Sequence, residues 1–149
     1  MNVLFVCLGN ICRSPLAEGI MRRLYKDHGI VGLIESAGTA DWNVGSRADS
    51  RAVKVALNNG IDIKNHTARQ LRHEDFEKFD LIIVMDRANE KAVKKIAPQA
   101  VHHKIRRALN DDDVIDPYHS DDAAFEDTFK TLWSSCQEMV MQLQKDAVK

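Results

Sequence analysis

Unbroken runs of apolar residues mark the strands that the sequence predicts most clearly. Val3–Val6 is one such run and a second lies within Asp80–Met85, and both are typical of strands buried on two faces of a sheet. Leu33–Ala37 has the composition of a further strand, and Lys104–Arg106 is a weaker candidate. We expect these segments to form one sheet.

Apolar positions three and four residues apart predict helices between and after these strands. The first helix is expected to begin at Ser14-Pro15, because serine suits the N-cap and proline the first helical position, and to stop at Gly29. Further helices are expected at Asp49–Asn59, Arg87–Ile96 and about Asp121–Lys145. The apolar stripe of the last helix includes Cys136, which is therefore expected to be buried.

Strands and helices alternate along the chain, with no repeat, linker or low-complexity segment. This alternation implies a parallel sheet with helices on both faces. A length of 149 residues suits one domain with one sizeable core. The prediction is a single α/β domain over residues 1–149.

Composition and charge narrow the function classes. The formal net charge is −1, so no overall field favours nucleic acid or an anionic membrane surface. No apolar stretch approaches the roughly 20 residues of a membrane span, and the first residues lack the basic segment of a signal peptide. Three cysteines without a Cys-x-x-Cys pair indicate neither a disulfide framework nor a metal site. We expect a cytoplasmic protein with reduced thiols, no metal and no cofactor.

The candidate chemistry lies in the segment between the first strand and the first helix, Cys7–Ser14. Ligands of open parallel sheets bind beyond the carboxyl ends of the strands, and backbone N–H groups at a helix N-terminus bind anions. Inorganic phosphate or another oxyanion is therefore expected in a loop that also contains Leu8, Gly9, Asn10, Ile11 and Cys12. No Gly-x4-Gly-Lys string occurs, so this is not the nucleotide-binding loop.

Cys7 and Arg13 supply a nucleophile and a phosphate-binding group at the two ends of this loop. The N–H donors, the helix dipole and Arg13 favour the Cys7 thiolate, the form in which cysteine is nucleophilic. Arg13 can bind two phosphoryl oxygens through its planar fork. Ser14 is expected to cap the helix and to donate its hydroxyl to the departing thiolate. A small buried packing residue is the alternative for Cys7, but its position between strand and helix favours catalysis.

A leaving phenolate or alkoxide needs a proton, and Asp116 is the candidate acid. In Asp116-Pro117-Tyr118, proline biases the aspartate toward extended backbone, and Tyr118 offers an aromatic wall beside it. From these three residues alone, an ordinary Asp-Pro turn is the alternative.

Taken together, these residues resemble the low-molecular-weight protein tyrosine phosphatase family. The resemblance extends in order along the chain, through Val3–Pro15, Ser36–Gly45, His66–Gln70, Phe79–Asp86 and Asp116–Tyr118. It implies a four-stranded parallel sheet and a two-step hydrolysis of phosphotyrosine in proteins, without a metal. Cys7 would form a cysteinyl-phosphate while Arg13 holds the equatorial oxygens. Asp116 would protonate the leaving group and then activate water.

The resemblance also implies supporting roles. Asn10 would hold the strained shape of the loop, and Trp42, Asn43 and Tyr118 would line the substrate cleft. The loop would be supported from behind by Ser36, His66 and Asp86. The partners implied are phosphotyrosine-containing proteins, and the chain is expected to be a monomer or weak dimer.

Cys12 matches a second loop cysteine that some members of the family carry. There it can form a reversible disulfide with the nucleophile and shield it from irreversible oxidation. A small packing residue is an equal alternative for Cys12.

Three other functions are weighed against this one. Arsenate reductases share the fold but need further redox cysteines, and only Cys136 follows here. Phosphoarginine phosphatases tend to have threonine where this chain has Ile11, and a bulky apolar residue favours an aromatic phosphomonoester. A phosphocarrier domain would not need Arg13 and Asp116 together. The chain also departs from many family members by having His119 and Ser120 after Tyr118, which bears on substrate preference.

Overall fold

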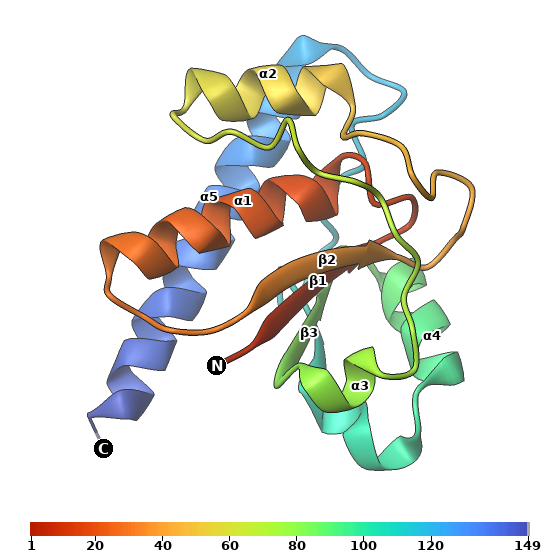
Figure 1. Cartoon of the computed structure of the whole chain (residues 1–149), viewed down its shortest axis with the longest axis vertical. Coiled ribbons are helices and arrows are strands. Elements are labelled where there is room, and N and C mark those ends of the chain that lie inside the picture. The colour runs from red at the N-terminus through yellow and green to blue at the C-terminus, as the bar shows by residue number, and fades with distance from the viewer. Residues whose placement is uncertain (149) are drawn as a thin grey trace.

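The computed structural model describes residues 1–148, and its centre is a parallel sheet of four strands in the order β2-β1-β3-β4. The strands are β1 (Val3–Cys7), β2 (Ile34–Gly38), β3 (Leu81–Val84) and β4 (Ile105–Arg107). The expected α/β fold with a four-stranded parallel sheet is confirmed, and each of the four predicted segments forms a strand. Crossovers run from β1 outward to β2 and then back past β1 to β3 (Figure 1).

Four helices lie at the predicted places. They are α1 (Arg13–Asp27), α2 (Ser50–Asn58), α4 (Arg87–Ile96) and α5 (Asp122–Ala147). Two shorter segments were not predicted, namely α3 (Asp75–Lys78) and the 3₁₀ segment η1 (Gln99–Lys104). They have four and six residues, too few to establish a helical period in the sequence.

Helices cover both faces of the sheet, as the alternation of elements predicted. Val3, Phe5 and Ile83 point toward one face and pack with residues of α1, α2 and α5. Leu4 and Ile82 point toward the other face, where α3 and α4 contribute to a second core cluster. Figure 1 shows these two groups of helices on opposite sides of the strands. Because successive side chains of a strand alternate between faces, continuous apolar runs are needed here.

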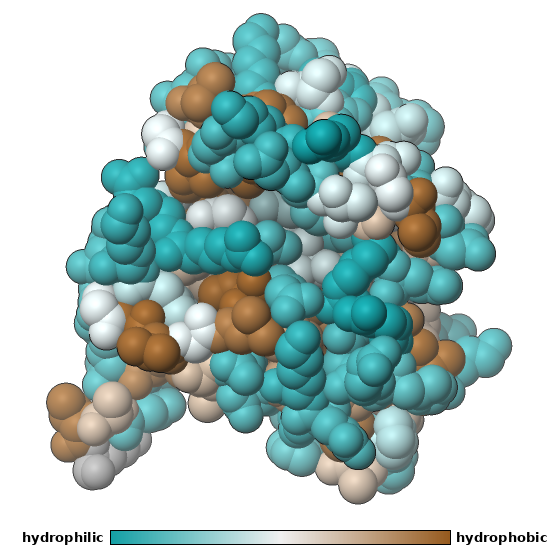
Figure 2. All heavy atoms as spheres, in the orientation of Figure 1, coloured by the Kyte–Doolittle hydropathy of each residue, from teal (hydrophilic) through white to brown (hydrophobic). Residues whose placement is uncertain are grey.

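One face of the molecule is largely hydrophilic. Figure 2 shows polar residues over most of one face, interrupted by separate apolar groups rather than by one continuous apolar area. None of the helices within residues 1–148 is both long enough and apolar enough to cross a membrane.

The start of α1 differs from the prediction that Ser14 is its N-cap. The helix begins at Arg13, Cys12 occupies the N-cap position without a side-chain hydrogen bond, and the Leu16 amide donates to the Cys12 carbonyl at 3.2 Å. Pro15 thus lies in the third helical position, where its missing N–H would have no partner within the helix in any case. The Ser14 hydroxyl is instead directed into the preceding loop.

Candidate active site

The loop after β1 crosses directly over the end of β2. The Thr39 amide donates to the Cys7 carbonyl at 2.9 Å, and the Ala40 amide donates to the Leu8 carbonyl at 3.0 Å. A Cβ atom added to Gly38 would lie 2.8 Å from the Leu8 carbonyl oxygen, so only glycine permits this approach. The loop is therefore held at the carboxyl edge of the sheet, where the end of β1 is hydrogen-bonded to the residues that follow β2.

The sulfur of Cys7 lies among hydrogen-bond donors at the start of this loop. The Ser14 hydroxyl oxygen is 2.9 Å from the Cys7 sulfur, and the Asn10 backbone N–H donates to it at 3.3 Å. Both Cys7 and Ser14 are buried. Donors that point at a sulfur favour its anionic form, so the site is suited to a nucleophilic thiolate.

Asn10 holds the loop in an unusual backbone conformation. Its φ of 58° is the only positive value at a non-glycine residue within residues 1–148. The side-chain amide donates to the hydroxyls of Ser14 at 2.8 Å and Ser36 at 3.0 Å, and its oxygen accepts the Arg69 backbone N–H at 3.0 Å. His66 Nε2 lies 2.8 Å from the Asn10 carbonyl oxygen. These contacts compensate for the strain of the left-handed backbone.

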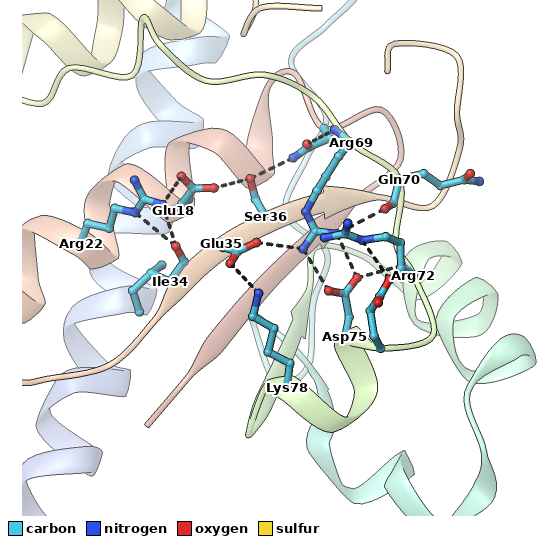
Figure 3. Close-up of polar contacts among 12 residues, drawn as sticks. Glu18, Arg22, Ile34, Glu35, Ser36, Arg69, Gln70, Arg72, Asp75 and Lys78 are labelled. Atoms are coloured by element: carbon cyan, nitrogen blue, oxygen red, sulfur yellow. Dashed lines mark hydrogen bonds and ion pairs between the residues drawn. The ribbon is translucent and has the colours of Figure 1, made fainter. Parts of the chain in front are cut away.

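A polar network extends from this support toward the surface (Figure 3). Ser36 donates to Glu18 at 2.7 Å, and Glu18 pairs with Arg22 one turn further along α1. The guanidinium of Arg69 donates two 3.0 Å hydrogen bonds to the fully buried carboxylate of Asp75. The residue whose backbone binds Asn10 is thus anchored by an ion pair between its half-buried guanidinium and a buried carboxylate.

Arg13 lies at the other end of the loop, with its guanidinium held from three directions. One nitrogen donates to Asp86 Oδ2 at 2.7 Å and to the Val114 carbonyl at 2.9 Å. The other nitrogen lies 3.6 Å from Asp116 Oδ2. Asp86 is itself fixed, because its second oxygen accepts the Asn89 N–H at the start of α4. This orientation leaves the fork at the edge of the loop, where an oxyanion would bind.

The predicted nucleophile, arginine and acid face one cavity of about 230 Å³. Its lining residues are Cys7, Leu8, Gly9, Ile11, Cys12, Arg13, Trp42, Asn43, Asp116, Tyr118 and His119. The Asn43 side chain reaches the Gly9 carbonyl at 3.4 Å, and the exposed Trp42 stands at the rim. Asn10, Ser14, Ser36, His66 and Asp86 do not line the cavity but support its loop from behind.

Sequence reasoning missed several residues that hold this site. Glu18 and Asp75 carried no motif, and Arg69 was noted only as part of a matching string. Asp49 and Arg51, which connect the loop to the segment after Asp116, were also missed. His119 was noted only as a departure from the family, yet it lines the cavity with its ring against that of Tyr118, at 4.9 Å between centroids. The contacts that make these residues part of the site join distant segments, such as Glu18 with Ser36 and Arg51 with Tyr118, so a local sequence pattern could not reveal them.

The remaining thiols differ from Cys7 in their surroundings. Burial raises the pKa of Cys12, and the nearby Asp49 and Asp116 carboxylates raise it further. Burial alone raises the pKa of Cys136, which lies on the buried face of α5 and is fully enclosed in the core, as predicted. Within the described part of the chain, no group of three or more His, Cys, Asp or Glu side chains is placed to hold a metal ion.

Comparisons with known proteins show the family of the chain. The model of the family described as "Low molecular weight phosphotyrosine protein phosphatase" matches residues 2–149. A protein of that name from Sus scrofa is 37% identical over 145 residues, with 91% of each chain covered.

Solved structures show the same fold. A protein tyrosine phosphatase from Entamoeba histolytica superposes with a TM-score of 0.93 at 32% identity, covering 99% of both chains. Vibrio vulnificus Wzb in complex with benzylphosphonate superposes with a TM-score of 0.86 at 30% identity, covering 95% of this chain and 97% of the other. The resemblance found in the sequence is thereby confirmed. The chain belongs to the low molecular weight phosphotyrosine protein phosphatase family, a family of hydrolases.

Proposed function

We propose that the chain hydrolyses phosphotyrosine in proteins through a cysteinyl-phosphate at Cys7. The observation that carries the proposal is that Cys7, Arg13 and Asp116 line one cavity, with the guanidinium 3.6 Å from the carboxylate. In the first step the thiolate attacks phosphorus, the bond from phosphorus to the tyrosine oxygen breaks, and Asp116 gives its proton to that oxygen. Arg13 and the loop N–H groups bind the phosphoryl oxygens throughout.

In the second step, water attacks the phosphorus of the cysteinyl-phosphate. Asp116, now ionised, accepts the proton of that water, and the bond between sulfur and phosphorus breaks. Cys7 leaves as a thiolate that the Ser14 hydroxyl can stabilise, since the two atoms lie 2.9 Å apart. Inorganic phosphate remains in the loop as product, so it is expected to inhibit competitively.

An aromatic ester suits the walls of the cavity. Trp42 and Tyr118 supply aromatic surface and Ile11 an apolar contact, which favours a flat ring over a guanidinium. The complex of Vibrio vulnificus Wzb with benzylphosphonate supports an aryl phosphate analogue in such a site. A catalytic thiol needs reducing surroundings, which supports a cytoplasmic location. The expected monomer or weak dimer stays a prediction.

The test uses two variants of the intact chain and aryl phosphate as substrate. Cys7→Ser is expected to abolish hydrolysis, and Asp116→Ala to lower kcat by about 10²–10⁴-fold, while both still bind phosphate or vanadate. Asp111→Ala, which removes an exposed carboxylate nearby, is the control and should retain full activity. Substantial activity of Cys7→Ser would overturn the proposal.

Two further measurements separate this function from its alternatives. A burst of product without turnover would indicate a phosphocarrier instead. Matched peptides with phosphotyrosine or phosphoarginine test the substrate class, and faster hydrolysis of phosphoarginine would contradict the proposal.

A further inference from the structure

Arg51, in the first turn of α2, binds the segment that follows Asp116. Its two terminal nitrogens each donate a 2.8 Å hydrogen bond, one to the Tyr118 carbonyl and one to the Ser120 carbonyl. The guanidinium also lies over the Phe125 ring, 4.4 Å from its centroid, and 5.8 Å from that of Tyr118. Two carbonyls and two rings from the same part of the chain therefore surround one cation.

The opposite side of Arg51 is bound to the phosphate loop through Asp49. The guanidinium donates to the two carboxylate oxygens of Asp49 at 3.1 and 2.9 Å. The backbone N–H of Asp49 donates to the Ile11 carbonyl at 2.8 Å. Arg51 thus connects Ile11, beside the nucleophile, with the segment that carries the acid.

The orientation of Asp116 depends on this segment. Its carboxylate accepts the Tyr118 backbone N–H at 3.1 Å, and the carbonyl of the same residue is the one bound by Arg51. Its other restraint is the 3.6 Å ion pair with Arg13. Because the Asp116 side chain is 44% exposed, close packing does not hold it in place. Hydrogen bonds must do so.

We propose that Arg51 is a positioning residue, which holds the 116–120 segment so that Asp116 reaches the leaving-group oxygen. This inference rests on the proposed role of Asp116 as the acid. The planar fork is essential, since one ammonium group cannot bind the carboxylate and two carbonyls in these directions. Arg51 does not itself line the cavity, and among the lining residues it acts on Tyr118, whose carbonyl it binds.

The test is the dependence of kcat/KM on the leaving group, because protonation matters most when the departing phenolate is basic. Phenyl phosphate and 4-nitrophenyl phosphate are compared for the parent chain, Arg51→Ala, Arg51→Lys and Asp116→Ala. Arg51→Ala is expected to lose about tenfold on phenyl phosphate and less than about threefold on 4-nitrophenyl phosphate. Arg51→Lys should recover only part of the loss. The control is Lys54→Ala, on the same helix as Arg51. It breaks an exposed ion pair with Asp122 of α5 and should leave both rates unchanged.

The double variant Arg51→Ala/Asp116→Ala decides between positioning and general structural damage. If Arg51 acts through Asp116, adding Arg51→Ala to Asp116→Ala lowers the phenyl phosphate rate by less than about twofold. Two results would overturn the inference. One is an equal loss of kcat/KM on both substrates in Arg51→Ala. The other is that Arg51→Ala lowers the phenyl phosphate rate of Asp116→Ala as much as it lowers that of the parent chain. Inhibition by inorganic phosphate reports the intact loop and should change little in Arg51→Ala.

The same data keep the two proposals apart. Should Asp116→Ala itself leave the leaving-group dependence unchanged, the acid would be wrongly assigned and the proposed function would fail. If Asp116→Ala makes kcat/KM depend more steeply on the leaving group while Arg51→Ala does not, only the positioning role of Arg51 would fail.

Discussion

The Ser14 hydroxyl oxygen lies 2.9 Å from the Cys7 sulfur and, at the same time, 2.8 Å from the side-chain nitrogen of Asn10 that donates to it. Because Asn10 supplies a hydrogen to the oxygen, the hydroxyl's own hydrogen is free to point at the sulfur. A Cys7 thiolate can only accept a hydrogen bond, so Ser14 is then the donor, a role that its position as the second residue of α1 alone would not require.

Replacing Ser14 by alanine is expected to slow the release of the thiolate from the cysteinyl-phosphate. A hydrogen bond to a charged group contributes about 1.5–3 kcal/mol, so kcat should fall on the order of 10–100-fold. Rapid-quench kinetics should show a burst of phenol followed by slow turnover. Ser135→Ala, which removes a buried hydroxyl bonded to the Ala108 carbonyl, is the control. A Ser14→Ala protein without a burst and with parental kcat would contradict this role.

Asn10 is expected to stabilise the folded chain in two ways, through the hydrogen bonds of its side chain and through its tolerance of a positive φ. Asn10→Ala loses three hydrogen bonds and places alanine at a φ of 58°, so the free energy of unfolding should fall by about 3 kcal/mol. Asn10→Gly loses the same bonds but accepts the positive φ, so it should lose less. Urea unfolding measures both. Parental stability of Asn10→Gly would show that the side-chain bonds contribute nothing.

The Asp49–Arg51 pair predicts a pH dependence of stability. Hydrogen bonds from Arg51 hold the pKa of Asp49 below its ordinary value of 3.8. A carboxyl whose pKa is lower in the folded chain stabilises it above the unfolded value, and that contribution is lost as pH falls through the folded value. The parent should therefore be more stable than Asp49→Asn at pH 6, and the difference should shrink below about pH 4. Urea unfolding at pH 6 and pH 3 tests this; a constant difference would contradict it.

Cys12 lines the same cavity as Cys7, which permits a test of the oxidation shield. Because burial raises the pKa of Cys12, it stays a thiol while peroxide attacks Cys7. The resulting sulfenic acid would condense with the Cys12 thiol to a disulfide and water. Peroxide-inactivated protein should then regain activity with added thiol, and Cys12→Ser should not. Equal recovery of the variant would leave Cys12 as a packing residue.

Local sequence determined the elements and the identity of the central loop. Val3–Val6 could be predicted as a strand because every side chain in it is apolar, and α5 because its apolar stripe spans many turns. The loop from Cys7 to Arg13 is contiguous, so its thiol, glycine and arginine could be interpreted together. The prediction that Ser14 is the N-cap of α1 was wrong for a local reason, because a serine before proline is normally a cap. The expectation that its hydroxyl lies beside Cys7 agrees with the structure.

Only the tertiary structure decided how the loop is held and which residues face it. The Asn10 side chain binds a backbone N–H 59 residues away, and Arg51 binds a carbonyl 67 residues away. Arg69, which pairs with the buried Asp75, also binds Glu35, 34 residues away. The helix α3 that carries Asp75 is too short to predict from sequence. Such contacts depend on where parallel strands end and on how helices pack, and periodicity reports only which face of an element is buried. The sequence by itself therefore indicated the loop with its candidate nucleophile and arginine, while packing brought Asp116 to Arg13 and Arg51 to the segment that carries Asp116.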